Sequence, residues 1–470
     1  MRIEKDQLGN KEILAESYYG IHTARAIENF NISNRAVNSK LILAIIEVKK
    51  AAAQANYKIG LLDNSIAEAI VTVCDDILLN QENSNYWKAL YTDAYQGGAG
   101  TSTNMNINEV IANAALEKLG HTKGNYSIIH PLNHVNLSQS TNDVYPTALR
   151  IAAIRETRRL SVKVSKLQEA LQTKENQFSS VLKLGRTQLM DALPITLGQE
   201  FGAWARAIAR DRWRIYKVEE RLREVNIGGT AIGTGMNAPM EYIYLITDYL
   251  QDNTGLGLSR SDFLVDATQN LDVFVEVSGL LKALAVNLIK ISNDLRLLAS
   301  GPSGGLGEIK LPPVQAGSSI MPGKVNPVIC EMIAQIGLRV IGNDSCITQA
   351  AMMGQLELNA FTPLVAEALL ESYSLLYNGI GTFIEKCIEG ISSNQEKCTS
   401  NLEYSSAMAT ALVYHLGYDK GCEIAIRSQE ENKTVRQIVL EEGLISPEEI
   451  EKIFNIYQIT SPGIPGKENQ

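Results

Sequence analysis

The chain has 470 residues, of which 45% are hydrophobic and 20% charged, and its formal net charge is −9 at pH 7. This balance is typical of a globular protein with a sizeable core and excludes an intrinsically disordered chain. The negative charge argues against a nucleic-acid-binding surface, which needs a basic face.

The N-terminal segment, Met1 to Asp6, contains no apolar run, and the apolar run from Leu41 to Ile46 is far too short to span a bilayer. We therefore expect a cytoplasmic protein that does not contact a membrane. The six cysteines include no C-x-x-C pair, and the five histidines include no H-x-H pair. We expect neither a disulfide framework nor a metal site.

Before about residue 142 the chain is predicted to form short, mixed elements joined by polar, glycine-bearing connections such as 97–108. Beyond it, apolar residues recur at alternating spacings of three and four, which predicts long helices with shared apolar seams. Further helices are expected near 196–224 and 362–386. The seams consist of Leu160, Val164, Leu167 and Leu171; of Val277, Leu281, Leu284, Leu288, Ile291, Leu295 and Leu298; and of Ile329, Ile333, Ile336 and Val340.

After about residue 397 the predicted segments shorten again. The sequence Ser446-Pro447-Glu448-Glu449 predicts an N-cap, a first-turn proline and a capping-box glutamate at the start of a small helix. We therefore predict a mainly α fold built around a long helical bundle. Its domains are expected at 1–142 (N-terminal), 143–396 (central bundle) and 397–470 (small, helical, C-terminal).

Four stretches, 97–106, 138–143, 185–192 and 317–327, are rich in hydroxyl and amide side chains. The first lacks the G-x-G-x-x-G spacing of a dinucleotide site, and the last has Val325 where a P-loop needs Ser or Thr to bind magnesium. Each stretch taken alone could be an ordinary polar turn between helices. Together they predict a polar cavity for an anion.

The stretch 317–327 has the composition of a loop that could close on an anion. Gly317 and Gly323 give it backbone freedom, and Pro322 and Pro327 restrict it. Pro327 is expected at the start of a helix whose N-terminal dipole adds positive potential. The loop offers a carboxylate two hydroxyls, a cation and an amide, from Ser318, Ser319, Lys324 and Asn326.

The sequence Gly-Ser-Ser-Ile-Met-Pro-Gly-Lys-Val-Asn-Pro at 317–327 resembles the signature loop of the aspartase/fumarase superfamily. Its members eliminate ammonia, water or an amine to give fumarate or a fumaryl product. The likeness continues through 18–30, 97–106, 138–143, 185–192, 228–237 and 293–301, and weakens after about residue 400. It implies an aspartase/fumarase-like fold, a homotetramer with active sites shared between three subunits, and no required cofactor.

The resemblance also implies site residues for a small dicarboxylate. Ser318 would be the general base, acting as an alkoxide favoured by Lys324, and an aci-carboxylate (enediolate) would be the intermediate. The residues matching positions that hold the β-carboxylate are Thr101, Ser140, Thr141 and Ser319. Those matching positions that hold the amino group and α-carboxylate are Asn142, Thr187, Lys324 and Asn326. For Thr101, Thr187 and Asn142 the alternative role is capping or turn formation.

Two positions bear on the leaving group. Class II fumarases typically read Gly-Ser-Gly-Thr-Gln where this chain has Gly98 to Ser102, and carry His at the position of Gln188, a further expected substrate contact. Some aspartases also carry that His, so Gln188 argues mainly against a fumarase. We expect reversible deamination of L-aspartate to fumarate; the alternatives are a fumarase-type hydratase and a catalytically silent structural homologue. Departures from the family pattern occur at Ser303, 358–363 and 412–415.

Overall fold

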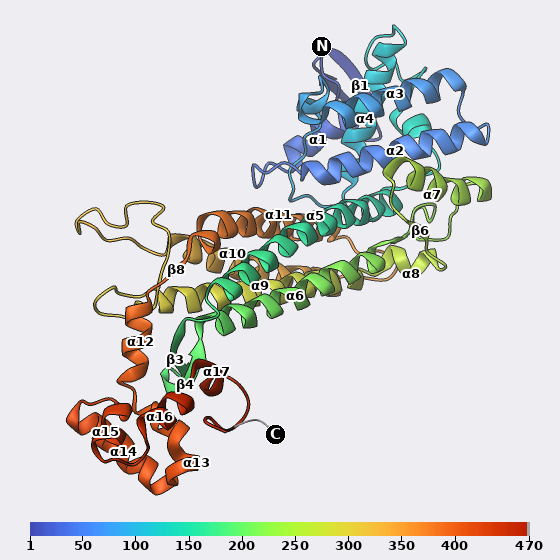
Figure 1. The fold of residues 1–470 in the computed structure, drawn as a ribbon. Helices are drawn as coiled ribbons and strands as arrows, with labels where there is room; N and C mark the ends of the chain where they lie inside the picture. Colours follow the sequence, from blue (N-terminus) through green and yellow to red (C-terminus); the bar gives the residue numbers. More distant parts are fainter. Residues whose placement is uncertain (468–470) are drawn as a thin grey trace. The chain divides into compact units, whose positions relative to one another are not determined.

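The computed structural model describes residues 1–467, most of which lie in helices (Figure 1). The chain separates into two compact units. Unit 1 comprises 1–161, 214–283 and 339–376, and unit 2 comprises 162–213, 284–338 and the chain from 377 onward. The mainly α fold is as predicted, whereas the division into three domains at residues 142 and 396 stays a prediction.

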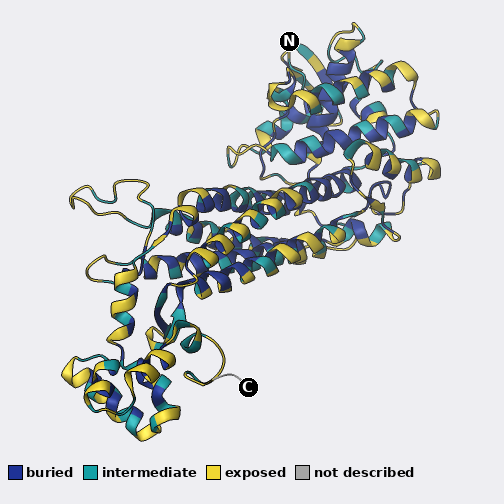
Figure 2. Ribbon diagram, viewed as in Figure 1, coloured by how far each residue is buried: buried dark blue, intermediate teal, exposed yellow. Residues whose placement is uncertain are grey.

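The predicted apolar seams lie in long helices. They fall in α5 (Thr141–Gln177), α9 (Asp272–Leu298) and α10 (Val328–Met352), and the other two expected helices are α6 (Leu197–Leu222) and α11 (Thr362–Lys386). The seams of α5 and α9 are buried along their whole length (Figure 2). In α10, Ile329 and Ile336 are only half-buried, so that seam is not filled within one chain.

Unit 1 begins with the antiparallel hairpin of β1 (Arg2–Asp6) and β2 (Gly9–Ile13). Helix α2 (Ser39–Lys58) packs against α3 (Asn64–Asn80) and α7 (Met240–Thr254). Helix α4 (Thr101–Lys118) starts after Gly100, whose φ is 92°; a Cβ atom there would lie 2.3 Å from the ring of Tyr145. Only glycine permits this close approach.

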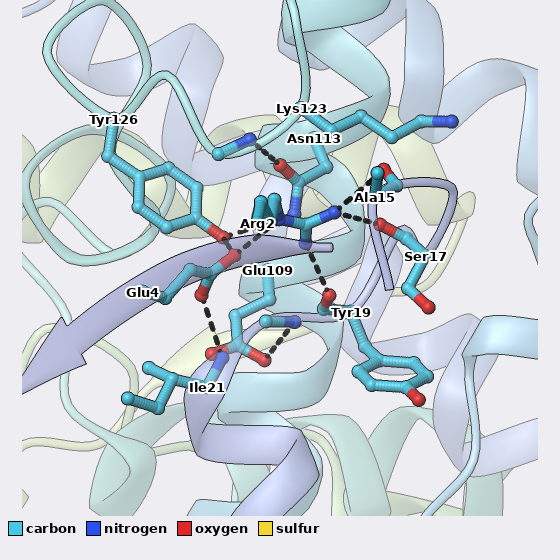
Figure 3. Close-up of polar contacts among 12 residues, drawn as sticks. Arg2, Glu4, Ala15, Ser17, Tyr19, Ile21, Glu109, Asn113, Lys123 and Tyr126 are labelled. Carbon is cyan, nitrogen blue, oxygen red and sulfur yellow. Dashed lines mark hydrogen bonds and ion pairs between the residues drawn. The ribbon is translucent and has the colours of Figure 1, made fainter. Parts of the chain in front are cut away.

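The first turn of α1 (Ile21–Asn29) is capped by two carboxylates from other elements (Figure 3). Glu109 of α4 accepts hydrogen bonds from the backbone N–H groups of Gly20 (2.8 Å), His22 (2.8 Å) and Thr23 (3.1 Å), and from the Thr23 hydroxyl (2.6 Å). Glu4 of β1 accepts from the N–H of Ile21 at 2.8 Å. These acids satisfy donors that a helix leaves unpaired, next to its positive end.

Gly20 permits this arrangement because it has no side chain. A Cβ atom at that position would lie 2.6 Å from Oε2 of Glu4 and 2.7 Å from the hydroxyl of Tyr126. Arg2 closes the network: its Nε donates to Glu4 at 2.8 Å, and its remaining nitrogens donate to carbonyl oxygens of the segment before α1. The N-terminal hairpin, α1 and α4 are thereby joined through buried charge.

Unit 2 contains the hairpin of β3 (Leu182–Thr187) and β4 (Met190–Thr196). Its C-terminal helices are α12 (Gln395–Glu403), α13 (Val413–Leu416), α14 (Tyr418–Glu431), α15 (Val435–Glu441), α16 (Pro447–Ile453) and α17 (Ile456–Ile459). The predicted start of α16 is confirmed: Ser446 and Glu449 form a reciprocal capping box, with Pro447 in the first turn. Within residues 1–467, no helix has the length and apolar character that crossing a bilayer requires.

Replacing Glu109 tests the capping network. In Glu109→Gln an amide NH₂ takes the place of one oxygen and faces backbone donors, so we expect the free energy of unfolding to fall by about 2–3 kcal/mol. Glu117→Gln, on the same helix but 48% exposed in a surface ion pair, should cost less than about 1 kcal/mol. Urea unfolding followed by circular dichroism measures both. Equal losses of unfolding free energy in the two variants would show that the hydrogen bonds of Glu109 do not stabilise the protein more than a surface ion pair does.

Candidate functional site

Unit 1 contains a polar cavity with a volume of about 580 Å³. Of the predicted site residues, Thr101, Ser140 and Thr141 line it. Asn142 lies beside them: its Nδ2 donates at 2.7 Å to the carbonyl oxygen of Ala231, which lines the opposite wall. The full lining comprises Thr101, Asn104, Met105, Leu132, Asn136, Ser138, Gln139, Ser140, Thr141, Thr230, Ala231, Ile232, Thr234, Met236 and Asn237.

Thr101 is the first residue of α4, and its hydroxyl donates to the carbonyl oxygen of Gly98 at 2.7 Å. This is the turn role considered as the alternative for Thr101. A hydroxyl that donates in this way can still accept a hydrogen bond through its lone pairs. To donate to a carboxylate, it must first break its hydrogen bond to Gly98. Thr141 differs, because its oxygen accepts a hydrogen bond from Nδ2 of Asn104 at 3.0 Å.

The buried carboxylate of Asp143 joins the two walls of the cavity. Its Oδ1 accepts from the N–H of Ser140 at 2.9 Å, and its Oδ2 accepts from the N–H groups of Gly228 (3.1 Å) and Thr230 (3.0 Å). Burial raises the pKa of Asp143 to about 7, and the three N–H groups and Lys49 oppose that rise. Asp143 therefore fixes the backbone on both sides of the cavity.

A buried lysine lies beneath the cavity floor. Lys49 of α2 has no exposed surface, and its Nζ donates to Oδ1 of Asn136 at 2.8 Å and to Oε1 of Gln139 at 2.9 Å. Burial lowers the pKa of Lys49 to about 7, which the negative potential of Asp143 partly offsets. The sequence analysis missed Lys49 and Asn136. The available signal was weak: Lys49 lies in the mainly apolar stretch 41–53, which also contains Glu47 and Lys50.

Unit 2 carries Thr187 and Gln188 at the tip of the β3–β4 hairpin. Thr187 pairs with Met190, which leaves Gln188 and Leu189 as a two-residue turn with φ values of 53° and 66°. Both residues are left-handed although neither is Gly, Asn or Asp, the residues such a turn favours. For ordinary L-residues this conformation costs roughly 1–2 kcal/mol each. Strain of this kind often marks a functional position.

Ion pairs hold the base of this hairpin. Glu308, which has no exposed surface, pairs with Arg186 at 2.8 Å and with Lys183 at 3.1 Å, and Lys183 also pairs with Glu200 at 2.8 Å. Burial raises the pKa of Glu308, but Arg186 and Lys183 outweigh it and hold that pKa below its usual value. Glu308 therefore stays ionised and secures the strand that ends in Thr187.

The loop 317–327 is closed at its base. The N–H of Gly317 donates to the carbonyl oxygen of Lys324 at 2.9 Å, and Nδ2 of Asn326 donates to the carbonyl oxygen of Gly317 at 2.6 Å. Within the loop, Oγ of Ser318 accepts from the backbone N–H groups of Ile320 (3.2 Å) and Met321 (2.9 Å). Two donors aimed at one hydroxyl oxygen favour its ionised form.

The ten predicted site residues thus form two groups. Thr101, Ser140, Thr141 and Asn142 lie in unit 1, and the other six lie in unit 2: Thr187, Gln188, Ser318, Ser319, Lys324 and Asn326. In unit 2, Ser319 and Lys324 are exposed, and α10 begins at Val328, directly after Pro327, as predicted. Ser303, where the family pattern has arginine, lies in an exposed bend. Within residues 1–467, no three His, Cys, Asp or Glu side chains lie together as ligands for a metal ion.

Two family models match the chain. Residues 9–342 match the family described as Lyase, and residues 408–461 match the family described as Fumarase C C-terminus. The similarity therefore extends well past residue 400, where the sequence motifs weaken.

Similar proteins are known in several organisms. The aspartate ammonia-lyase of Bacillus subtilis (strain 168) is 47% identical over 99% of this chain and 98% of its own length. A cobalt-bound structure from Brucella melitensis, described as fumarate lyase:delta crystallin, is 46% identical with a TM-score of 0.94 over 98% of this chain and 100% of its own. A class II fumarase from Schistosoma mansoni is 31% identical with a TM-score of 0.92 over 98% and 99%.

Replacing Asp143 with asparagine tests whether it holds the two cavity walls. The amide of Asp143→Asn can offer an oxygen to only one side, so its NH₂ must face either Ser140 or the pair Gly228 and Thr230. We expect a loss of roughly 2–3 kcal/mol in unfolding free energy. We also expect faster hydrogen exchange at the amides of Gly228 and Thr230.

The exposed Asp252 of α7 provides the matched control. Asp252→Asn should change the unfolding free energy by no more than about 0.5 kcal/mol. Unchanged exchange at Gly228 and Thr230 in Asp143→Asn would contradict the assigned role.

Proposed function

The chain belongs to the lyase family within the aspartase/fumarase superfamily, and from that membership we propose that it is an aspartate ammonia-lyase. It converts L-aspartate reversibly to fumarate and ammonia. The fold alone does not distinguish this reaction from hydration, since the class II fumarase has a TM-score of 0.92. The observation that carries the proposal is the identity: 47% to an aspartate ammonia-lyase against 31% to the fumarase.

The substrate is a dicarboxylate, which the net charge of −9 would repel from most of the surface. Its site therefore depends on local donors. The hydroxyls of Thr101, Ser140, Thr141 and Ser319 hold the β-carboxylate. The amino group and α-carboxylate contact Asn142, Thr187, Lys324 and Asn326, and Gln188 is a further substrate contact.

Ser318 is the general base. Its alkoxide removes a proton from carbon 3, next to the β-carboxylate, and the electron pair moves onto that carboxylate as an aci-carboxylate. When this intermediate collapses, the double bond forms between carbons 2 and 3, the C–N bond breaks, and the ammonium group on carbon 2 leaves as neutral ammonia. Donors placed for the developing charge lower the barrier. The N–H groups of Ile320 and Met321, which already point at Oγ of Ser318, support its ionisation. No step requires a cofactor.

The active site is assembled from three subunits of a homotetramer. The tip of the β3–β4 hairpin supports this arrangement, because Leu189, Met190 and Leu193 are 72%, 71% and 57% exposed there, beside Thr187 and Gln188. Three large apolar side chains at one exposed tip favour burial against another subunit. A cytoplasmic location stays a prediction from the sequence.

Substrate turnover tests the proposed reaction. The purified chain should produce fumarate, followed by its ultraviolet absorbance, from L-aspartate and release one ammonia per fumarate. L-Malate should give no fumarate, because Gln188 cannot change its protonation state near neutral pH as His can. Turnover of L-malate without L-aspartate would identify a fumarase instead. Turnover of neither would leave a catalytically silent homologue.

A further inference from the structure

Lys49 lies in a setting that its neighbour on the same helix avoids. Lys50 reaches the surface and pairs with Asp75 at 2.6 Å, whereas Lys49 is completely enclosed. Burying an ammonium group costs several kcal/mol unless its donors are satisfied. Its two hydrogen bonds go to neutral amide oxygens, those of Asn136 and Gln139, and both of these residues line the cavity.

Lys49 sets the direction of a chain of hydrogen bonds. In its ammonium form Lys49 can only donate, so Asn136 turns its Oδ1 toward the lysine. The same orientation lets Nδ2 of Asn136 donate to the carbonyl oxygen of Gln139 at 3.1 Å. Oδ1 of Asn136 also accepts from Nδ2 of Asn104 at 3.1 Å, so Asn104 must turn its amino group toward Asn136. That amino group also donates to Oγ1 of Thr141 at 3.0 Å. Nδ2 of Asn108 donates to the same Oδ1 of Asn136 at 3.1 Å, so Lys49 is one of three donors that this oxygen accepts.

The orientation of the Asn104 amide leaves one of its own atoms without a hydrogen bond, which indicates that its neighbours impose the orientation. The Oδ1 atom of Asn104 is buried and has no hydrogen-bond partner among the described residues. A buried carbonyl oxygen without a hydrogen bond destabilises the folded protein. Turning the amide over would not relieve it without placing an oxygen against Oδ1 of Asn136. The donor bonds to Asn136 and Thr141 therefore hold Asn104 in place.

The consequence reaches the cavity through Thr141. Because its oxygen already accepts from Asn104, the hydroxyl proton of Thr141 is available to point into the cavity it lines. If Asn104 were reversed, Thr141 would donate to Asn104 and would present lone pairs to an incoming carboxylate. An anion needs a donor at this position.

We propose that Lys49 is a positioning residue for the substrate: acting through Asn136 and Asn104, it fixes the Thr141 hydroxyl as a hydrogen-bond donor to the substrate carboxylate. This inference rests on the proposed binding of a dicarboxylate in the cavity. Lys49 does not touch the substrate. It determines the polarity of a group that does.

Binding of succinate, a dicarboxylate that has no amine to lose, measures this role apart from catalysis. Calorimetry should give a dissociation constant about tenfold weaker for Thr141→Val, because one hydrogen bond to a charged group is lost. Lys49→Met should weaken binding to a similar degree. The double variant should be no weaker than either single variant, because both changes remove the same interaction. Lys50→Met is the matched control and should bind succinate as the unchanged protein does.

The outcomes separate this inference from the proposed function. If Thr141→Val binds succinate normally, the cavity is not the carboxylate site and the proposed binding fails. If Thr141→Val weakens binding but Lys49→Met does not, or if the two effects multiply, the lysine does not act through Thr141. If Lys49→Met does not fold, Asn104→Leu decides. It cuts the last link, and normal succinate binding by that variant would overturn the proposal.

Discussion

One buried carboxylate, Asp143, joins two segments of unit 1 that are 85 residues apart in the chain. It accepts backbone N–H groups from Ser140 on one side and from Gly228 and Thr230 on the other. Its pKa of about 7 reflects the free-energy cost of burying it. In return, Asp143 fixes the backbone on both sides of the cavity before a ligand binds. Preorganised binding of a charged transition state requires such a fixed backbone.

Two other buried acidic side chains, Glu109 and Glu308, also hold separate segments of the chain together. Glu109 caps α1, and Glu308 neutralises Lys183 and Arg186 at the base of the β3–β4 hairpin. Because these carboxylates are buried, their negative charge is compensated by donors inside the protein. Among the described residues, hydroxyls and amides, and no carboxylate, line the cavity of unit 1. A chain with a net charge of −9 can in this way present neutral donors to an anionic substrate.

The sequence predicted the helices well because apolar periodicity is a local property, and the α16 capping box was read directly from Ser446 and Glu449. The resemblance located the polar stretches. It did not reveal the β3–β4 hairpin, whose turn at Gln188 and Leu189 lacks the usual Asn-Gly signal. Nor did it reveal the path from Lys49 to Thr141. Such contacts depend on which side chains meet across 80 or more residues, as Lys49 and Asn136 do, and periodicity does not contain that information.

Subunit mixing tests most directly whether one lyase site is built from both groups of residues. Ser318→Ala and a Ser140→Ala, Thr141→Val double variant should each be nearly inactive toward L-aspartate. Mixed oligomers, confirmed by capture of a tag on one variant, should regain activity in about one quarter of their sites, since each required segment has an even chance of being intact. Mixed oligomers as inactive as their parents would contradict a site shared between subunits.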